Sequence, residues 1–330
     1  MEDRKKDHID LAFESQTSRN ELDKRFHYEP MLAAHPTGDW QPFGFLGKTC
    51  RIPLWVSSMT GGTSLARKIN QNLATVCKEF GFGMGLGSCR IILRDQTHFS
   101  DFDMRGFIGD DLPFYANLGI CQVEELIETN NFQLITELVK RLQSDGLIIH
   151  VNPMQEWFQP EGDVLKRPPI ETIKKVLDKA NFPVIVKEVG QGIGPLSLKE
   201  LLKLPLEAVE FAAFGGTNFA KVELLRDNTD AMSLFEPLST IGEDAIEMLD
   251  SVNQIAATEK ISCNQLIISG GVKTFLDGYY LIQKSKIPAV YGQASNFLKY
   301  AREDTDALRN YVSQQIKGLK MANAYLRIKN

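Results

Sequence analysis

Eight short apolar runs recur along the chain, and nearly every one ends in a glycine or a polar residue. In two clear examples, residues 184–186 precede Lys187 and residues 266–269 precede Gly270-Gly271. Buried strands that are each followed by a polar or glycine-rich loop are typical of a parallel β/α barrel. Because such barrels carry their chemistry at one rim, the residues that end these runs are the first candidates for function.

Helical patterns separate the apolar runs, so strands and helices alternate along the chain. This alternation predicts an α/β fold, a closed (β/α)8 TIM barrel of about 250 residues with right-handed crossovers. The predicted strands are 54–58, 82–86, 114–118, 147–151, 184–189, 208–213, 266–269 and 289–291. An open doubly wound sheet is the alternative, but no Gly-x-Gly-x-x-Gly follows the first strand.

Two parts of the chain do not follow this alternation of strands and helices. Residues 1–50 predict an N-terminal extension, with a possible short helix at 11–26, and residues 51–330 predict the barrel. The long connection 214–240 predicts either a lid over the active rim or a surface excursion with a short helix.

Composition and charge limit the classes of function. The chain has 43% hydrophobic and 24% charged residues, as ordinary globular proteins do, and its net charge of −5 argues against nucleic-acid binding. Its start is charged and no apolar window has the length of a membrane span, so no membrane association is expected. The five cysteines are odd in number and form no Cys-x-x-Cys pair, which favours a reducing compartment and a cytoplasmic protein.

A lysine ends the fifth predicted strand. Alternation along the strand places Ile185 and Lys187 on one face. If that face is the barrel interior, a cation lies at the top of a mostly apolar barrel and requires an anionic or electron-rich partner. An ordinary ion pair with a carboxylate such as Glu188 is the simpler alternative, but the position at the end of a barrel strand favours a functional role.

The fourth predicted strand also ends in polar groups. Alternation places His150 and Asn152 on one face, and Gln155 and Glu156 follow in the loop. Hydrogen-bonding groups beside a carboxylate are suited to a ligand that carries a hard cation, whereas the spacing disfavours zinc. Asn117, at the end of the third strand, predicts either a hydrogen-bonding arm or turn chemistry.

Glycine pairs follow three of the predicted strands, at Gly61-Gly62, Gly215-Gly216 and Gly270-Gly271. Each pair lets backbone N–H groups approach a ligand closely, and many barrels bind phosphate with the loops after their last strands. Three pairs at one rim predict a phosphorylated cofactor. Arg90, after the second strand, predicts either a bidentate phosphate contact or a surface salt bridge.

Together these motifs resemble those of the type 2 isopentenyl-diphosphate isomerases, a family of flavin-dependent barrels. The resemblance covers nearly the whole chain in order. It is most specific in the stretches His150-Val151-Asn152-Pro153-Met154-Gln155-Glu156 and Gln159-Pro160-Glu161-Gly162-Asp163. The other matching stretches are Arg4-Lys5-Lys6-Asp7-His8, Met59-Thr60-Gly61-Gly62, Gly87-Ser88-Cys89-Arg90, Asn117, Lys187-Glu188-Val189-Gly190, Gly215-Gly216-Thr217 and Ser269-Gly270-Gly271.

The resemblance implies a site for FMN, Mg²⁺ and a diphosphate substrate. The residues implied to bind FMN are Met59, Thr60, Gly61, Ser88, Asn117, Lys187 and Thr217, with Gly270, Gly271, Ala294 and Ser295 around its phosphate. The residues implied to meet the substrate are Arg4, Lys5, Ser88, Arg90, His150, Asn152 and Gln155. Gln155, Lys187 and His150 are the expected catalytic residues, and Glu156 is the expected Mg²⁺ ligand.

Four sites, which comprise five residues, depart from the family's usual pattern. The chain has Cys89 where the family usually has Gln, Ala212 where it has Ser, Val272-Lys273 where it has an Ile-Arg-like pair, and Asn296 where it has Pro. These departures touch one diphosphate contact and one or two flavin contacts.

The reaction that the resemblance implies moves the double bond of isopentenyl diphosphate to give dimethylallyl diphosphate. Reduced FMN, formed with NADPH or NADH, would act as acid and base without net oxidation of the substrate. The alternatives are an FMN-dependent oxidoreductase of a small hydroxy acid, a non-catalytic flavin-binding barrel, and an aldolase or synthase with a Lys187 Schiff base. A homo-oligomer, tetramer or octamer, is also implied, in which the basic N-terminal arm could complete a neighbour's site.

Overall fold

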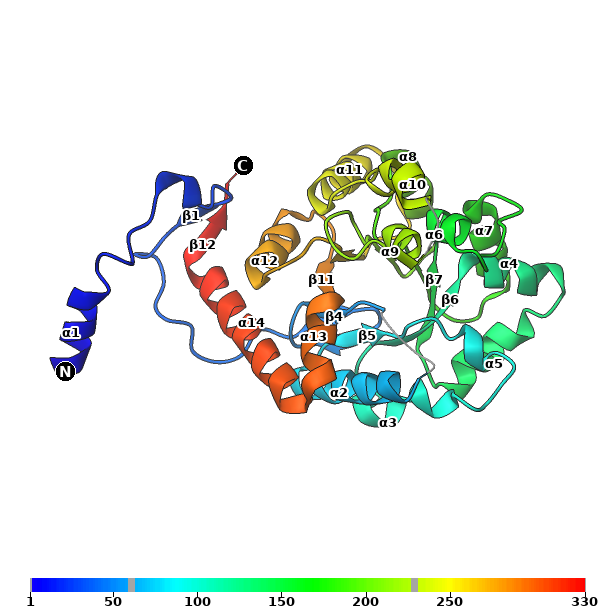
Figure 1. Cartoon of the computed structure of the whole chain (residues 1–330), viewed down its shortest axis with the longest axis horizontal. Helices are drawn as coiled ribbons and strands as arrows, with labels where there is room; N and C mark the ends of the chain where they lie inside the picture. The colour runs from blue at the N-terminus through cyan, green and yellow to red at the C-terminus, as the bar shows by residue number, and fades with distance from the viewer. Residues whose placement is uncertain (1, 59–62, 227–230, 330) are drawn as a thin grey trace.

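The computed structural model describes residues 2–58, 63–226 and 231–329, and its centre is a closed barrel of parallel strands (Figure 1). The (β/α)8 prediction is confirmed, and all eight predicted strands are present. Neighbours around the barrel follow the order β10-β11-β4-β5-β6-β7-β8-β9. The barrel strands are β4 (Leu54–Val56), β5 (Gly83–Gly85), β6 (Phe114–Gly119), β7 (Gly146–His150), β8 (Val184–Lys187), β9 (Ala208–Glu210), β10 (Leu266–Ser269) and β11 (Ala289–Gln293).

Helices on the outside of the barrel connect the strands. Several begin with well-formed caps: the Thr63 hydroxyl accepts the Ala66 N–H at 3.1 Å at the start of α2, and Asp244 and Glu247 form a capping box on α11. The principal helices are α2 (Ser64–Phe80), α4 (Ile120–Glu128), α5 (Gln133–Arg141), α7 (Pro169–Lys179), α8 (Pro195–Leu202), α11 (Ala245–Thr258), α12 (Phe275–Lys284) and α14 (Thr305–Tyr325). The shorter or additional ones are α1 (Glu2–Asp10), α3 (Arg105–Ile108), α6 (Pro153–Phe158), α9 (Phe219–Arg226), α10 (Ala231–Ser239), α13 (Ser295–Glu303), η1 (Arg19–Glu21), η2 (Arg90–Ile92) and η3 (Phe99–Asp101).

The barrel interior contains an apolar layer of side chains. Its members are Trp55, Tyr115, Ile148, Ile185, Ala208, Ile267 and Val290. The rings of Trp55 and Tyr115 meet edge to face with their centroids 6.2 Å apart, and a Cβ at Gly83 would lie 2.5 Å from the Trp55 indole. The small residue on β5 therefore makes room for the large one on β4, so that this layer fills the barrel.

A polar layer lies directly above the apolar one. Because alternate residues of a strand share a face, it consists of the residues two positions further along each strand. Its members are Ser57, Gly85, Asn117, His150, Lys187, Glu210, Ser269 and Gly292. The barrel thus changes from apolar to polar at the carboxyl ends of its strands, where TIM barrels place their active sites.

Five barrel strands, β4, β5, β7, β8 and β9, end one to three residues earlier than the sequence predicted, and for β8 and β9 the local cause is visible. After β8, the Glu188 carboxylate accepts the backbone N–H groups of residues 190–192 at 2.6 to 3.0 Å and turns the chain out of the sheet. After β9, Ala212 adopts a φ of +44°, in the left-handed region, which also ends the extended conformation. The predicted ends at 189 and 213 are therefore wrong for a local, conformational reason.

The N-terminal extension contributes strands to two places. The hairpin of β2 (Phe43–Phe45) and β3 (Lys48–Cys50) buries Phe45, Leu46 and Cys50 against the apolar layer of the barrel. Further upstream, β1 (Phe26–Tyr28) pairs antiparallel with β12 (Leu326–Ile328) at the other end of the chain. The helix expected at 11–26 is wrong: α1 ends at Asp10, and the polar residues that follow include Ser, Thr and Asn, which favour turns over helix.

The connection 214–240 forms α9 and α10, with residues 227–230 outside the described part of the chain. Ala220 and Leu224 of α9 pack with Phe158 of α6, and the Phe158 and Phe235 rings lie 5.8 Å apart. This connection therefore packs on α6, the helix that follows β7 at the rim of the barrel.

The five cysteines are all buried as free thiols. In the part of the chain that the structure describes, no helix combines the length and apolar character that crossing a membrane requires.

Candidate active site

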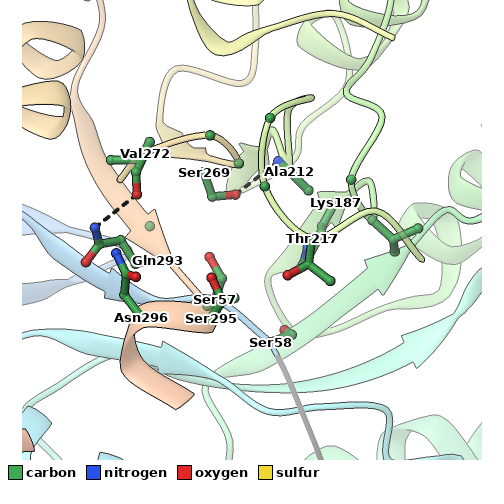
Figure 2. Close-up of a pocket in the computed structure, with 18 of the residues that line it drawn as sticks. Ser57, Ser58, Lys187, Ala212, Thr217, Ser269, Val272, Gln293, Ser295 and Asn296 are labelled. Carbon is green, nitrogen blue, oxygen red and sulfur yellow. Dashed lines mark hydrogen bonds between the residues drawn. The ribbon is translucent and has the colours of Figure 1, made fainter. Parts of the chain in front are cut away.

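A cavity of about 320 Å³ opens at the carboxyl ends of the barrel strands (Figure 2). Its walls come from the ends of β4 and β8, from the loops after β9 and β10, and from the start of α13. Among the lining residues that the structure describes, only Lys187 and Lys273 are charged. Two cations without a carboxylate on the same wall make the cavity suited to an anionic ligand.

One side of the cavity is made of backbone. A Cβ at Gly270, whose φ is +85°, would lie 2.1 Å from the backbone nitrogen and oxygen of Ala213, so only glycine fits there. The facing loop approaches just as closely, since a Cβ at Gly216 would lie 3.1 Å from the Gly271 nitrogen. Between these loops, α13 begins at Ser295 without a side-chain cap, so its first N–H groups are open to a phosphate.

The structure brings six of the predicted cofactor residues to this cavity: Lys187, Thr217, Gly270, Gly271, Ala294 and Ser295. The predicted residues Met59, Thr60 and Gly61 lie outside the described residues. Two serines that were not among the predicted residues, Ser57 and Ser58, also line the wall, and their buried hydroxyls have no hydrogen-bond partner among the residues that the structure describes. Buried polar atoms are nearly always paired, so these hydroxyls fit a ligand with polar atoms of its own.

Lys187 is almost completely buried at the bottom of the cavity. Its Nζ donates to the backbone carbonyl of Glu188 at 2.8 Å and lies 3.9 Å from Oε1 of Glu210 on the neighbouring strand β9. Glu188 therefore contributes its carbonyl, and the carboxylate beside the lysine is that of Glu210. Glu210 was not among the predicted site residues, although it is the single glutamate within the apolar run 208–213.

His150 and Asn117 meet in the polar layer. The Asn117 Nδ2 donates to the Leu86 carbonyl at 3.0 Å, which turns Oδ1 toward His150 Nδ1 at 2.7 Å. Nδ1 therefore carries the proton and Nε2 is left as an acceptor. Burial, with a smaller contribution from the nearby Lys187 charge, lowers the pKa of His150 to about 3, so the imidazole is neutral at physiological pH.

This histidine makes the stability of the protein depend on pH. The unfolded chain binds a proton at His150 near pH 6.5, whereas the folded chain resists it down to about pH 3. Stability is therefore complete above pH 6.5 and is lost as the pH falls through this window, by at most about 1.4 kcal/mol per pH unit. We expect His150→Gln to flatten the pH dependence of the unfolding midpoint between pH 6.5 and 4.5.

The matched control for this measurement is His8→Gln, since His8 lies exposed on α1. This variant should keep the slope of the parent. Identical slopes for the parent and His150→Gln would show that His150 is not held neutral by the fold.

A hydrogen-bonded group on α6 adjoins the polar layer. The Asn152 Nδ2 donates to Gln155 Oε1 at 3.1 Å and to Glu156 Oε1 at 2.9 Å, and Glu156 Oε2 accepts the Asp163 N–H at 2.8 Å. The Asn152 Oδ1 is buried and has no hydrogen-bond partner in the described part of the chain. Because β7 ends at His150, Asn152 stands before α6 rather than on the strand, and the alternation expected for these two residues does not apply.

Two further contacts extend this group. Arg90 forms a half-exposed salt bridge of 2.8 Å with Asp163, which ties the loop after β5 to the loop after α6, and Ser88 lies exposed on the same loop as Arg90. Gln155 Nε2 donates at 3.3 Å to Oε1 of Glu223, a buried residue of α9. No sequence pattern predicts the Glu223 contact, because this contact depends on the packing of α9 against α6.

The geometry can be compared with known proteins. No family model matches the chain. The isopentenyl-diphosphate delta-isomerase of Rickettsia akari (strain Hartford) is 35% identical over 274 residues, which cover 83% of this chain and 76% of the relative. The enzyme of that name from Rickettsia africae (strain ESF-5) is 34% identical over 278 residues, which cover 84% and 78%.

The chain belongs to the isopentenyl-diphosphate delta-isomerase family. Among solved structures, a mandelate oxidase variant with a C4a-OH-FMN adduct aligns with a TM-score of 0.61 and 12% identity over 94% of this chain and 89% of that one. A flavocytochrome b2 variant with sulfite bound aligns with a TM-score of 0.63 and 12% identity over 91% and 72%. At this identity the two structures show that the chain shares their barrel fold.

The chain offers one carboxylate at the position expected for a metal. Its described residues contain no group of three or more His, Cys, Asp and Glu side chains that could hold an ion. Glu156 alone suits Mg²⁺, which is commonly held by one or two carboxylates, several waters and the phosphates of a substrate. A metal at Glu156 would therefore arrive with the substrate rather than reside in a protein cage.

Arg4 and Lys5 are not brought to the cavity. Both lie on α1, whose described side chains are exposed, and α1 stands apart from the barrel beyond the β1–β12 pair (Figure 1). The structure therefore assembles the expected substrate residues of the loops and α6 in one area and leaves these two outside it.

The four departures from the family pattern each have a defined environment. Cys89 is buried, its N–H donates to the Asn117 carbonyl at 2.8 Å, and burial raises the pKa of its thiol to about 12. The Ala212 N–H donates to Ser269 Oγ at 3.0 Å, and the Val272 carbonyl accepts a hydrogen bond from Gln293 Nε2 at 3.0 Å (Figure 2). Asn296 Nδ2 donates to the Lys273 carbonyl at 2.9 Å. The chain's own residues therefore complete the local hydrogen bonding at these positions.

Proposed function

We propose that this chain converts isopentenyl diphosphate into dimethylallyl diphosphate, with FMN bound in the cavity and Mg²⁺ on the diphosphate. Membership of the isopentenyl-diphosphate delta-isomerase family supports the reaction. The observation that carries the assignment of FMN is the cavity itself, whose described walls hold two lysines, no carboxylate and a close-packed glycine cradle at the carboxyl ends of the strands. These features are those of a barrel phosphate site.

The residues present fit the parts of FMN. The glycine loops and the first turn of α13 would hold the phosphate, and Lys187 with the unpaired hydroxyls of Ser57 and Ser58 would face the ring system. When bound in its reduced form, with NADPH or NADH as the reductant, FMN supplies an acid–base group and negative charge beside the substrate. Lys187 would stabilise that negative charge through its buried ammonium.

The α6 group would receive the substrate. Glu156 would carry the Mg²⁺ that neutralises the diphosphate, and Arg90 would donate to its phosphate oxygens. Gln155 would orient the reacting part of the substrate, because an amide does not titrate usefully and so does not act as an ordinary acid. His150 is neutral and presents Nε2 as an acceptor, so it would bind a hydrogen-bond donor without adding charge.

The decisive experiment uses the purified chain with FMN, Mg²⁺, dithionite and isopentenyl diphosphate under anaerobic conditions, followed by product analysis. We expect dimethylallyl diphosphate, with no net consumption of reductant per turnover. A protein that binds FMN and forms no such product would overturn the proposal. Reduction of the bound flavin by a small 2-hydroxy acid such as mandelate would instead select the oxidoreductase.

The basic N-terminal arm gives a separate prediction. We propose that Arg4 and Lys5 act in the site of a neighbouring copy in a homo-oligomer, because α1 stands apart from its own barrel. Losing one charge-assisted contact, about 1.5 to 3 kcal/mol, should raise the KM for isopentenyl diphosphate about tenfold or more in Arg4→Ala and Lys5→Ala. Flavin affinity should not change.

Mixing two impaired variants distinguishes action in a neighbour's site from action within one subunit. Subunits of Lys5→Ala and Lys187→Ala, unfolded and refolded together, should regain part of the activity if the arm reaches across. Activity that does not rise above that of the separate variants would refute the exchange of arms between copies.

A further inference from the structure

A buried carboxylate lies behind the cavity, at the end of β9. Glu210 is completely buried within the polar layer of the barrel. Its Oε1 accepts a hydrogen bond from Ser269 Oγ at 3.1 Å and lies 3.9 Å from Lys187 Nζ, while its Oε2 has no hydrogen-bond partner within the described ranges 2–58, 63–226 and 231–329. A buried charge with an unpaired oxygen destabilises the fold, so its presence in a barrel core calls for a role.

Glu210 is connected to the cavity through two neighbouring side chains. Glu210 does not line the cavity, but Lys187 and Ser269, its two contacts, both do (Figure 2). These contacts come from β8 and β10, the strands on either side of β9, and Lys187 is directly opposite Glu210 in the strand register. The carboxylate therefore acts on a ligand only through the ammonium and the hydroxyl in front of it.

The charge of Glu210 opposes that of Lys187. A lysine alone at the bottom of a low-dielectric cavity would strongly favour whichever form of the ligand carries more negative charge. A carboxylate 3.9 Å behind the ammonium cancels part of that field and holds the ammonium in place. Of the Lys187 donors, one is already committed to the Glu188 carbonyl at 2.8 Å, which leaves the others between Glu210 and the cavity.

We infer that Glu210 is a positioning residue for Lys187, and that it sets how strongly the site prefers reduced, anionic FMN over oxidised FMN. This inference rests on the proposed flavin site. Glu210 weakens the preference of the site for reduced FMN. The midpoint potential of the bound flavin is therefore lower than it would be if Lys187 had no carboxylate beside it. Ser269 helps to hold the Glu210 carboxylate in place. Its hydroxyl donates to Glu210, and its oxygen accepts the Ala212 N–H at 3.0 Å.

The test compares three variants that keep the shape of the side chain or its charge. Glu210→Gln removes the charge, and Glu210→Asp keeps it. Glu207→Gln is the matched control, since Glu207 precedes β9 at the opposite end of the barrel, where its Oε1 accepts from Gln265 at 3.2 Å. The measurements are the dissociation constants of oxidised and reduced FMN by anaerobic fluorescence titration and the midpoint potential of the bound flavin.

We expect Glu210→Gln to favour reduced over oxidised FMN about tenfold more than the parent does. For a two-electron couple this corresponds to a midpoint potential about 30 mV higher. Glu210→Asp keeps the negative charge, so its affinity ratio and midpoint potential should lie close to those of the parent. Glu207→Gln should have the same affinity ratio and midpoint potential as the parent. A structural role alone would change stability in Glu210→Gln and leave the ratio of the two affinities unchanged.

Each other outcome has a defined meaning. A folded Glu210→Gln variant whose affinity ratio stays within twofold of the parent overturns the inference and leaves the flavin site standing, whereas a parent that binds no FMN overturns the proposed function itself. If Glu210→Gln does not fold, the double variant Lys187→Met/Glu210→Gln removes both charges, and recovery of folding supports the pairing. Failure of the double variant to fold any better than Glu210→Gln overturns it.

Discussion

Replacing Lys187 with alanine is expected to weaken FMN binding by about 10- to 100-fold, because the cavity loses its buried cation, and charge-assisted contacts contribute about 1.5 to 3 kcal/mol. The same change leaves Glu210 buried without a counter-ion. We therefore also expect the free energy of unfolding to fall by about 3 kcal/mol. Titration of the flavin-free protein with FMN, followed by fluorescence, and thermal unfolding measure the two effects separately.

The control is Lys199→Ala, which removes a partly exposed lysine of α8 that pairs with Glu259. It should change neither the flavin affinity nor the stability by more than about 0.5 kcal/mol, since surface ion pairs contribute little. Flavin affinity that is unchanged in Lys187→Ala would remove the lysine from the proposed site.

Replacing Glu156 with glutamine is expected to lower kcat/KM for isopentenyl diphosphate by at least about a hundredfold. A neutral amide is a poor ligand for Mg²⁺, and a metal that neutralises a diphosphate contributes several kcal/mol at about 1.4 kcal/mol per tenfold in rate. The glutamine oxygen still accepts one of the two hydrogen bonds that Glu156 receives from Asn152 and Asp163, so α6 should keep its place. Activity measured against Mg²⁺ concentration should show loss of activation, with flavin content intact.

Glu161→Gln is the matched control for this experiment. Glu161 lies five positions further along, is exposed, and pairs with Arg226. Its replacement should leave the Mg²⁺ dependence as in the parent. A Glu156→Gln variant that responds to Mg²⁺ as the parent does would show that the metal is held elsewhere.

The barrel and much of the polar layer could be predicted because a single rule governs both. Alternation along buried strands makes the residue two positions after the last apolar interior residue point to the same face, and this rule predicts Lys187 from Ile185. The same rule, applied from Trp55 and Ala208, would have given Ser57 and Glu210. Glu210 was missed because the apolar residues 211–213 follow it and made the strand look longer than β9 is.

Contacts between segments that are distant in sequence could not be predicted in this way. The hydrogen bond between Gln155 and Glu223 exists only because Phe158 and Leu224 pack α6 against α9, and no periodicity in either segment encodes that partnership. The placement of Arg4 and Lys5 shows a related difficulty. A basic motif in the sequence indicates that a segment can bind an anion, but it does not indicate where the segment lies in the fold. The helix α1, which carries this motif, extends away from the barrel.

The pairing of β1 with β12 has a practical consequence for anyone who cuts or tags this chain. Phe26 is opposite Ile328 and Tyr28 is opposite Leu326, so the final residues fasten the leading segment although three hundred positions separate them. Trimming the tail by five residues would remove this strand pairing and leave the leading segment attached through its other contacts, such as the salt bridge between Arg25 and Asp277 at 2.8 Å. Affinity tags at either terminus should therefore be joined through a linker that leaves the pairing of β1 with β12 intact.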